Sequence, residues 1–374
     1  MKILEISSAP VSFNGGTEKV VLELSKDLSK KHEVTILQTT LYEQDKKSGV
    51  EKNGNLKIIT CKNDYFAKGF GYSLEFKNVL KKIYKNFDLI HIHGHGRFTS
   101  TYALRFLKYK KPIIYTAHGF FHTSASGKIK KIYNFIFSKI KNGVSIFIAL
   151  TPLEEKEYVR LGIKKEKVVI LPNWVNLREF KATKKKKYFS NSYPVLFCVG
   201  RIHESKGMQF VLEAIKNLKV NFLIAGRDVG YLKTLKQIVK SQKIEKRVKF
   251  LGEISDGEKR KAYSSSDFFV LFSEWEGFGI VVLEALAYGL PTIVSNKGAL
   301  PYLIQNKKNG IIAKFPNVND LREKINLLLK DKKLNKILYK NSKEFIKKFD
   351  SKIIIKEYEK LYGKAIHDFK KKKL

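Results

Sequence analysis

The feature that most constrains the fold is a repeated alternation of short apolar segments with longer segments of helical periodicity. The first set of apolar segments comprises KILEIS, EVTIL, LKIIT, DLIHIH, PIIYTA, VSIFIAL and KVVILP. The pattern then restarts with PVLFCVG, NFLIAG, RVKFLG, DFFVLFS, PTIVS and GIIA. Continuous apolar strands that alternate with helices are typical of parallel sheets covered by helices on both faces.

The restart indicates two domains, because a chain of 374 residues is longer than one ordinary core accommodates. Residues 181–190, KATKKKKYFS, form a lysine run that reads as a linker. We therefore predict two tandem doubly wound, Rossmann-like α/β domains at 1–180 and 191–350, followed by a C-terminal helix and basic tail at 351–374. Ligands of such sheets bind beyond the carboxyl ends of the strands, so we expect the domains to face each other across a cleft that holds the site.

The composition points to a soluble, cytoplasmic protein. Hydrophobic residues make up 43% of the chain, which is typical of a globular protein. The N-terminus reads directly as a strand rather than as a signal peptide, and no run approaches the ~18 apolar residues of a membrane span. Cys61 and Cys198 stand singly in strand-like segments, which indicates buried thiols in a reducing compartment.

The net charge of +38 suggests nucleic acid or an anionic membrane as a partner. Almost all of the positive excess is lysine, so a lysine-biased composition explains the charge equally well. The chain lacks the aromatic-rich motifs and helix-turn-helix signals of nucleic-acid-binding proteins. We therefore expect no nucleic acid, although a basic nucleic-acid-binding protein remains the alternative from another class.

One segment carries the composition of a membrane-surface helix. Residues 128–141 read KIKKIYNFIFSKIK, in which an apolar stripe at helical spacing is flanked by basic residues. The stripe comprises Ile129, Ile132, Tyr133, Ile136 and Ile140, and the flanking residues are Lys128, Lys130, Lys131, Lys139 and Lys141. Interfacial helices have this pattern, but a helix that covers a parallel sheet also needs an apolar stripe. Both interpretations stay open.

The segment SEWEGFGIVVLEALAYGLPTIVS combines a strand end, a glycine loop and a helix that begins near Gly279. Glu284 lies among apolar neighbours in this helix, where an unpartnered carboxylate is costly, and Glu276 lies in the loop. A helix N-terminus after a glycine loop binds anions, and carboxylates accept hydrogen bonds from hydroxyl groups. The pair therefore predicts a site for a sugar or ribose.

A second loop, in VGRIHESKGMQF, places Arg201 and Lys206 before another helix. Two cations at one loop suit a diphosphate, with Arg acting as a fork and Lys as a point charge. The chain contains neither the phosphate loop of nucleotide triphosphatases nor an Asp-x-Asp pair that would bridge phosphates through Mg²⁺. The cations are therefore expected to stabilise a departing phosphate without a metal.

In the first domain, Gly15 and Gly16 follow the first strand, where paired glycines let the backbone approach a ligand. His118 follows the strand PIIYTA at its carboxyl end. The segment HIHGHG places His91, His93 and His95 at period two, hence on one strand face; these residues are a zinc site in the less favoured interpretation. The list of ligands lacks a carboxylate or Cys, so we expect no metal.

Three stretches resemble the retaining GT-B glycosyltransferases of glycosyltransferase family 4: VGRIHESKG, FSEWEGFGIVVLEALAYGLPTIVS and ALTPLEEKEYVRLGIKKEKVVILPNWVN. The resemblance covers nearly the whole chain in order. It implies a metal-independent hexosyltransferase that moves a sugar from a nucleotide-diphosphate sugar to a hydroxyl acceptor, such as a lipid-linked or cell-surface glycan precursor. No cofactor is implied beyond the donor substrate. Nucleotide-sugar hydrolysis or epimerisation on the same fold is the enzymatic alternative.

The resemblance also implies roles for the motif residues of the second domain. Arg201 and Lys206 would hold the diphosphate, Glu284 the ribose hydroxyls and Glu276 the donor sugar. The backbone that would line the phosphate and sugar site is that of Gly277, Phe278 and Gly279.

For the first domain, the resemblance implies that Gly16, beside Gly15, approaches the donor or acceptor, and that His118 contacts the reacting sugar. Two segments depart from the family pattern. Residues 173–176 read Asn-Trp-Val-Asn where the family usually has Asn-Gly-Val-Asp, and 299–302 read Ala-Leu-Pro-Tyr where a Glu often stands. Turn contacts at the first segment and donor contacts at the second are therefore not carried over.

Overall fold

The computed structural model describes residues 1–13, 15–41, 48–67, 70–120, 127–181 and 183–372. The chain divides into two compact units. The first consists of Met1–Asn173 together with Lys352–Leu374, and the second of Trp174–Ser351. This division differs from the predicted one in two places. The chain enters the second unit before the lysine run at 181–190, and its C-terminal helix belongs to the first unit.

The first unit is built on an eight-stranded sheet in the order β10-β9-β8-β7-β1-β2-β4-β3, which is parallel except for the antiparallel pair β3–β4. Its strands are β1 (Lys2–Ile6), β2 (Glu33–Thr39), β3 (Gly49–Asn53), β4 (Leu56–Cys61), β7 (Leu89–His93), β8 (Ile113–Thr116), β9 (Ile146–Ala149) and β10 (Val168–Ile170). A separate hairpin pairs β5 (Tyr65–Ala67) with β6 (Phe70–Tyr72). The helices are α1 (Gly16–Leu28), α2 (Leu74–Ile83), α3 (Phe98–Leu107), α4 (Gly127–Ile140), α5 (Pro152–Arg160) and α13 (Ser351–Lys371).

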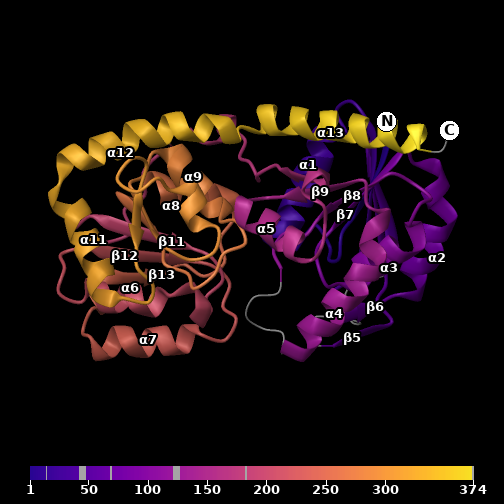
Figure 1. Cartoon of the computed structure of the whole chain (residues 1–374). Helices are drawn as coiled ribbons and strands as arrows, with labels where there is room; N and C mark the ends of the chain where they lie inside the picture. Colours follow the sequence, from indigo (N-terminus) through magenta and orange to yellow (C-terminus); the bar gives the residue numbers. More distant parts are fainter. Residues whose placement is uncertain (14, 42–47, 68–69, 121–126, 182, 373–374) are drawn as a thin grey trace. The chain divides into compact units, whose positions relative to one another are not determined.

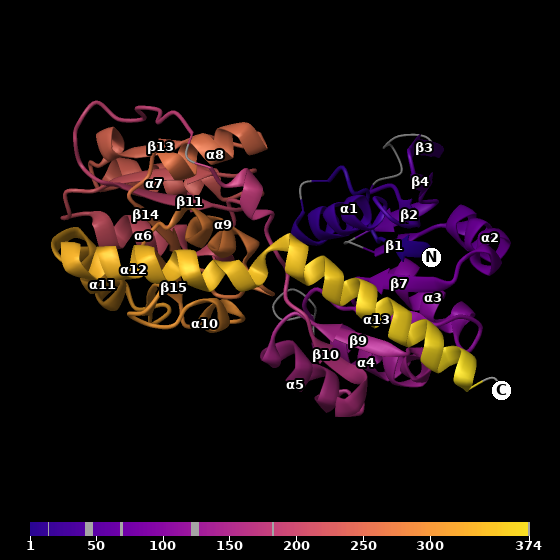
Figure 2. The ribbon, with the colours of Figure 1, turned by 90° about the horizontal axis from the view of Figure 1, so that it is seen from above.

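The second unit contains a parallel six-stranded sheet in the order β13-β12-β11-β14-β15-β16. Its strands are β11 (Val195–Val199), β12 (Asn221–Ala225), β13 (Val248–Phe250), β14 (Phe268–Leu271), β15 (Thr292–Ser295) and β16 (Ile311–Ala313). The helices are α6 (Met208–Ile215), α7 (Leu232–Ser241), α8 (Asp256–Ser264), α9 (Ile280–Tyr288), α10 (Leu300–Leu303), α11 (Val318–Lys330) and α12 (Lys332–Phe345). Every residue of β12 and β14 is buried, as expected for strands that helices cover on both faces (Figures 1 and 2).

Both sheets reverse their strand order beside their first strand. In the first unit, β2 pairs with one edge of β1 and β7 with the other. In the second unit, β12 and β14 flank β11 in the same way. The two units are therefore doubly wound α/β folds, and in each the loops after the paired central strands mark the place where such sheets bind ligands.

Helix α13 closes the first unit, although it is the last helix of the chain (Figure 2, yellow). One face of the helix is buried and carries Ile354, Tyr358, Tyr362 and Ala365. The face lies against the sheet, because the hydroxyl group of Tyr362 bonds with side chains of β1 and β7. None of the helices in the described part of the chain is long and apolar enough to cross a membrane.

Candidate functional site

The loops after β11 and β14 of the second unit are joined by backbone hydrogen bonds. The amide of Glu274 donates to the carbonyl of Ser205 over 2.8 Å, and the amide of Ala299 donates to the carbonyl of Glu276 over 3.0 Å. The hydroxyl group of Ser295, at the end of β15, donates to the carbonyl of Ser273 over 2.5 Å. The two predicted motifs therefore form one connected edge of the sheet.

Two glycines are required by the backbone at this edge. Gly207, between the first loop and α6, has φ +66°, and a Cβ atom there would lie 2.0 Å from the carbonyl oxygen of Phe272. Gly279, before α9, has φ +97°. Since side chains with a Cβ atom rarely adopt such angles, these positions fix how each loop enters its helix. The N–H groups of the first turn of α9 thus begin directly at the glycine loop, as anion binding requires.

Lys206 and Glu276 form an ion pair across this edge. The Nζ atom of Lys206 lies 2.6 Å from Oε1 of Glu276, and each side chain is 14% exposed. The hydroxyl group of Ser273 donates to the same carboxylate oxygen over 2.8 Å. Arg201 lies on the same loop and is exposed. The structure thus brings together Lys206, Glu276 and the loop that carries Arg201. A phosphate bound here would contact Lys206, whose charge is already balanced by Glu276.

Glu284 is buried, and two residues of α8 meet its carboxylate. Nζ of Lys259 lies 2.7 Å from Oε1, and the hydroxyl group of Tyr263 donates to Oε2 over 3.0 Å. Burial would lower the pKa of Lys259, but Glu284 and Asp256 outweigh it and raise that pKa. Glu276 and Glu284 therefore have different lysine partners.

The predicted backbone lining at Gly277, Phe278 and Gly279 contains one buried side chain. Phe278 is 4% exposed, and its ring centroid lies 6.5 Å from that of Phe349 in an edge-to-face arrangement. The ring therefore belongs to the core of the second unit. The side chain of Phe278 is therefore not available to a ligand.

In the first unit, the paired glycines stand at the start of α1. Gly15 is the N-cap residue, and a Cβ atom there would lie 2.0 Å from Oε2 of Glu18. At Gly16, by contrast, an added Cβ atom would meet nothing within 4 Å. The backbone at Gly16 therefore has open space beside it, which is where the resemblance expects a ligand to approach.

His118 follows β8 in a left-handed conformation, with φ +55°. The residues on either side are held by α5: the hydroxyl group of Tyr158 accepts from the amide of Ala117 over 2.9 Å, and Oε1 of Glu154 accepts from the amide of Gly119 over 2.8 Å. Burial and the nearby His93 lower the pKa of His118 well below its ordinary value. At neutral pH the ring is therefore neutral, and its backbone is fixed by two side chains.

The three histidines of HIHGHG do not form one cluster. His91 and His93 are adjacent, with ring centroids 3.8 Å apart, whereas His95 lies beyond β7 and packs against Phe120 at 4.7 Å. The carboxylate that the sequence interpretation lacked is Glu5 of β1. One ligand atom each from Glu5, His91 and His93 lies within 4.8 Å of the others, close enough to hold a metal ion. All three side chains are fully or almost fully buried.

Short hydrogen bonds already use the donor and acceptor atoms of this cluster. Nε2 of His93 lies 2.6 Å from Oε2 of Glu5, and Nδ1 of His91 lies 2.6 Å from the hydroxyl group of Tyr362. Burial alone would raise the pKa of Glu5, but His91 and His93 lower it to about 2. In this structure the carboxylate of Glu5 is held by donors of the protein itself.

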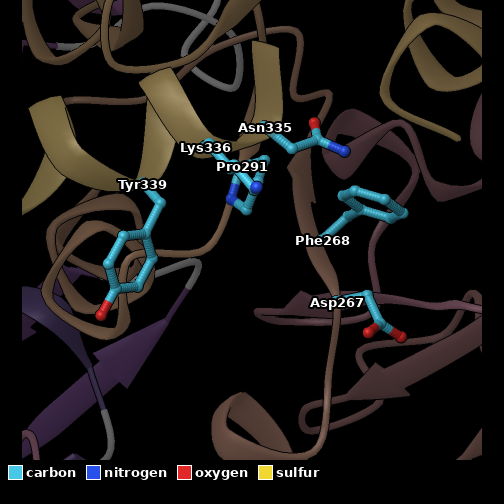
Figure 3. A pocket seen from close by; sticks show the side chains of 6 residues that line it. All are labelled: Asp267, Phe268, Pro291, Asn335, Lys336 and Tyr339. Carbon is cyan, nitrogen blue, oxygen red and sulfur yellow. The ribbon is translucent and has the colours of Figure 1, made fainter. Parts of the chain in front are cut away.

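A pocket of about 370 Å³ in the second unit lies away from these loops (Figure 3). Its walls are Asp267, Phe268, Pro291, Asn335, Lys336 and Tyr339. Asp267 and Pro291 precede β14 and β15, so the pocket opens at the amino ends of the strands. Doubly wound sheets bind ligands at the opposite edge, and the pocket is therefore not part of the candidate site.

Helix α4 contains most of the predicted membrane-surface segment 128–141, and the structure describes its side chains only from residue 134. Phe137 and Ile140 are buried in the core of the first unit, whereas Phe135 is 65% exposed and Ile136 is 40% exposed. The predicted stripe is thus divided: Ile140 packs inward, and Ile136 faces solvent beside Phe135. The lysines at 128, 130 and 131 lie outside the described side chains.

The sequence interpretation missed several partners. Lys259 and Tyr263, the partners of Glu284, belong to no recognisable sequence motif. Tyr362, a partner of Glu5, lies 357 residues away along the chain. Glu5, however, is a carboxylate inside the apolar strand KILEIS. A buried carboxylate among apolar residues was the signal that pointed to Glu284, and the same signal could have identified Glu5. Cys61 and Cys198 are buried free thiols, as expected.

Comparison with known proteins supports the assignment that these loops suggest. A family model described as Glycosyltransferase Family 4 matches residues 14–179, and one described as Glycosyl transferases group 1 matches residues 179–345. The chain is similar to the N,N'-diacetylbacillosaminyl-diphospho-undecaprenol alpha-1,3-N-acetylgalactosaminyltransferase of Campylobacter jejuni, at 28% identity over 77% of this chain and 80% of that protein.

The UDP-Gal:alpha-D-GlcNAc-diphosphoundecaprenol alpha-1,3-galactosyltransferase of Escherichia coli is also 28% identical, over 76% of this chain and 77% of that protein. Among solved structures, sucrose-phosphate synthase of Thermosynechococcus elongatus has a TM-score of 0.84 at 21% identity, covering 98% of this chain and 99% of that one. The two sheets, their motif loops and these similarities agree. The chain belongs to glycosyltransferase family 4 and has the GT-B fold of two Rossmann-like domains.

Proposed function

We propose that the protein is a metal-independent, retaining hexosyltransferase that uses a nucleotide-diphosphate sugar as donor. The observation that carries this proposal is the Lys206–Glu276 ion pair, with Arg201 on the same loop, at the reversal point of the second sheet. Cations and helix N-termini at this edge suit the diphosphate, and a carboxylate beside them suits the sugar hydroxyls. Glu284, at the helix that follows, is assigned to the ribose.

In the proposed reaction, the bond between the anomeric carbon and the diphosphate oxygen breaks while the acceptor hydroxyl attacks from the same face. Arg201, Lys206 and the first turns of α6 and α9 stabilise the negative charge on the departing diphosphate. The hydroxyl proton leaves with the diphosphate, and the configuration of the sugar is retained. Glu276 orients the donor sugar. In the first unit, His118 and the backbone at Gly16 keep the roles that the family resemblance implies.

The proposed acceptor is a lipid-linked or cell-surface glycan precursor, reached at the cytoplasmic face of a membrane. The names of the two curated relatives support this choice, since each contains a diphosphoundecaprenol acceptor. The exposed Phe135 and Ile136 on α4, together with the positive charge of the chain, support a peripheral contact with anionic lipid. The comparisons give no support to a nucleic-acid-binding role.

The test is a panel of labelled nucleotide sugars, scored for release of nucleoside diphosphate with and without a lipid extract as the source of acceptor. Release that requires the extract supports transfer, whereas equal release without it indicates hydrolysis. The anomeric configuration of the product, read by NMR, decides retention. The active pairing is repeated with EDTA, and we expect no loss. Loss that Mn²⁺ or Zn²⁺ restores would contradict metal independence and identify a metal site in the protein.

A further inference from the structure

A buried chain of polar side chains leads from the C-terminal helix to His118. The hydroxyl group of Tyr362 donates to Oε1 of Glu5 over 2.9 Å, and Oε2 of Glu5 lies 2.6 Å from Nε2 of His93. Nδ1 of His93 lies 2.8 Å from Nε2 of His118. Tyr362, Glu5 and His93 are at most 1% exposed. Three separate segments, α13, β1 and β7, thus meet behind one residue of the candidate site.

The positions of the protons along this chain follow from donor and acceptor chemistry. An ionised carboxylate only accepts hydrogen bonds, so Nε2 of His93 must carry a proton. Burial and His91 lower the pKa of His93 to about 4, against the opposing effect of Glu5, so this ring is neutral and its Nδ1 is an acceptor. Nε2 of His118 must then be the donor, which leaves Nδ1 of His118 with a lone pair.

His91 completes the same assignment. Its Nδ1 lies 2.6 Å from the hydroxyl oxygen of Tyr362. Because the hydroxyl group of Tyr362 donates its proton to Glu5, Nδ1 of His91 must be the donor in this second bond. Its Nε2 then accepts from the hydroxyl group of Thr116 over 2.8 Å. With Glu5 ionised and His93 neutral, this placement of the protons satisfies every hydrogen bond named here.

We propose that Tyr362, Glu5 and His93 are positioning residues that fix the tautomer of His118, so that its Nδ1 atom accepts a hydrogen bond from a hydroxyl group of a bound sugar. The role in catalysis rests on the proposed function; the tautomer rests on the network alone. The hydrogen bonds between α5 and the amides of Ala117 and Gly119 hold the backbone of His118. The hydrogen-bonded chain Tyr362–Glu5–His93, here called the relay, holds its ring. Such outer contacts orient a reactive imidazole and set its tautomer.

The first measurement needs no substrate. The full chain is labelled with ¹⁵N-histidine, and the His118 signals are identified by their loss in His118→Asn. We expect the Nε2–H tautomer of His118 at neutral pH. In Glu5→Gln the side-chain amide can donate to Nε2 of His93 as well as accept from it. The proton of His93 can then move to its Nδ1, and a population of His118 with the proton on Nδ1 should appear. A wild-type His118 that carries its proton on Nδ1 would overturn the proposal.

The second measurement is turnover with the active donor and acceptor. Glu5→Gln should reduce kcat by about 10- to 100-fold, the range for outer partners of a functional imidazole, and change the donor KM by less than about twofold. Tyr362→Phe removes the hydrogen bonds with Glu5 and His91 and should reduce kcat by about 2- to 10-fold. Tyr358→Phe is the matched control, because it removes an equally buried hydroxyl group from the same helix, and its kcat should equal that of the wild type.

Thermal unfolding of each variant separates positioning from folding. A loss of kcat in Tyr358→Phe as large as in Tyr362→Phe, or a loss in Glu5→Gln without any change in the His118 tautomer, would contradict the relay. So would one equivalent of zinc bound to the purified protein and lost in Glu5→Gln, because the metal would take the lone pairs that the relay uses. If no sugar is transferred by the wild type, the proposed function fails, and the tautomer measurement still decides the relay.

Discussion

The two units hold their hydrogen-bonded carboxylates in different ways. In the second unit, Glu276 and Glu284 each face a lysine, at 2.6 Å and 2.7 Å. In the first unit, Glu5 is held by imidazole and phenol groups, and Glu154 by the amides of Gly119 and Leu150. Lysine pairs balance charge and can rearrange around an anionic ligand. Neutral donors instead hold the side chains in one arrangement, which suits a site whose task is to orient the ring of His118.

The largest effect is expected at Glu284, because its removal leaves the partly buried Lys259 without its main partner. Glu284→Ala should lower the free energy of unfolding by about 3–5 kcal/mol, the cost of breaking a buried ion pair. It should also weaken binding of the nucleoside diphosphate by about 1.5–3 kcal/mol in calorimetry, through lost hydrogen bonds to ribose. Lys259→Met is the control: it should destabilise the fold but leave nucleotide affinity intact. Unchanged affinity in Glu284→Ala would leave Glu284 a structural residue.

Lys206→Ala tests whether the second pair serves chemistry rather than folding. Turnover should fall by about 10²- to 10³-fold, the cost of losing one group that stabilises charge in the transition state. The apparent binding constant of the donor should change far less, since phosphate charge grows as the bond breaks. Lys216→Ala, an exposed lysine after α6, is the matched control. Weaker donor binding with full turnover would argue against a role in leaving-group departure.

Glu154 should give the first unit a distinct dependence of stability on pH. Burial raises the pKa of Glu154 to about 7, against the opposing effect of the amides of Leu150 and Gly119. Because the pKa is raised on folding, the contribution of Glu154 to the free energy of unfolding is fully present below about pH 4.5 and is lost as the pH rises through about 7. The free energy of unfolding of Glu154→Gln should therefore gain on the wild type over this range, by at most about 3 kcal/mol. Equal curves in chemical denaturation would show that Glu154 is ionised throughout.

The smallest effect is expected at the membrane surface. Changing Lys128, Lys130 and Lys131 to Glu should weaken sedimentation with anionic vesicles, by about 1 kcal/mol per lysine at most. The same change at Lys184, Lys185 and Lys187, exposed residues of the second unit, alters net charge equally and serves as the control. Equal loss in both variants would show that overall charge, not α4, drives binding. No loss in either would assign α4 to the core alone.

Local patterns in the sequence were sufficient to predict the order of strands, loops and helices around the motif residues of the second unit. The strand, loop and helix order around Arg201, Lys206 and Glu276 is confirmed, because parallel strands bring their carboxyl ends to one edge whatever lies between them. The apolar runs likewise predicted the two sheets. The unit boundary was less accessible, because the C-terminal helix folds onto the first sheet and leaves no composition signal that it does so.

The sequence by itself determined the two doubly wound units, the edges at which sheets of this kind bind ligands and the order of the motif residues of the second unit. These follow from periodicity, glycine positions and charge within short stretches. Only the tertiary structure decided the partners of the buried carboxylates. Lys259 meets Glu284 from a neighbouring helix, and Tyr362 meets Glu5 from the other end of the chain. The physical reason is that a buried charge must find donors wherever the packed chain supplies them, and sequence spacing does not encode which distant segment that will be.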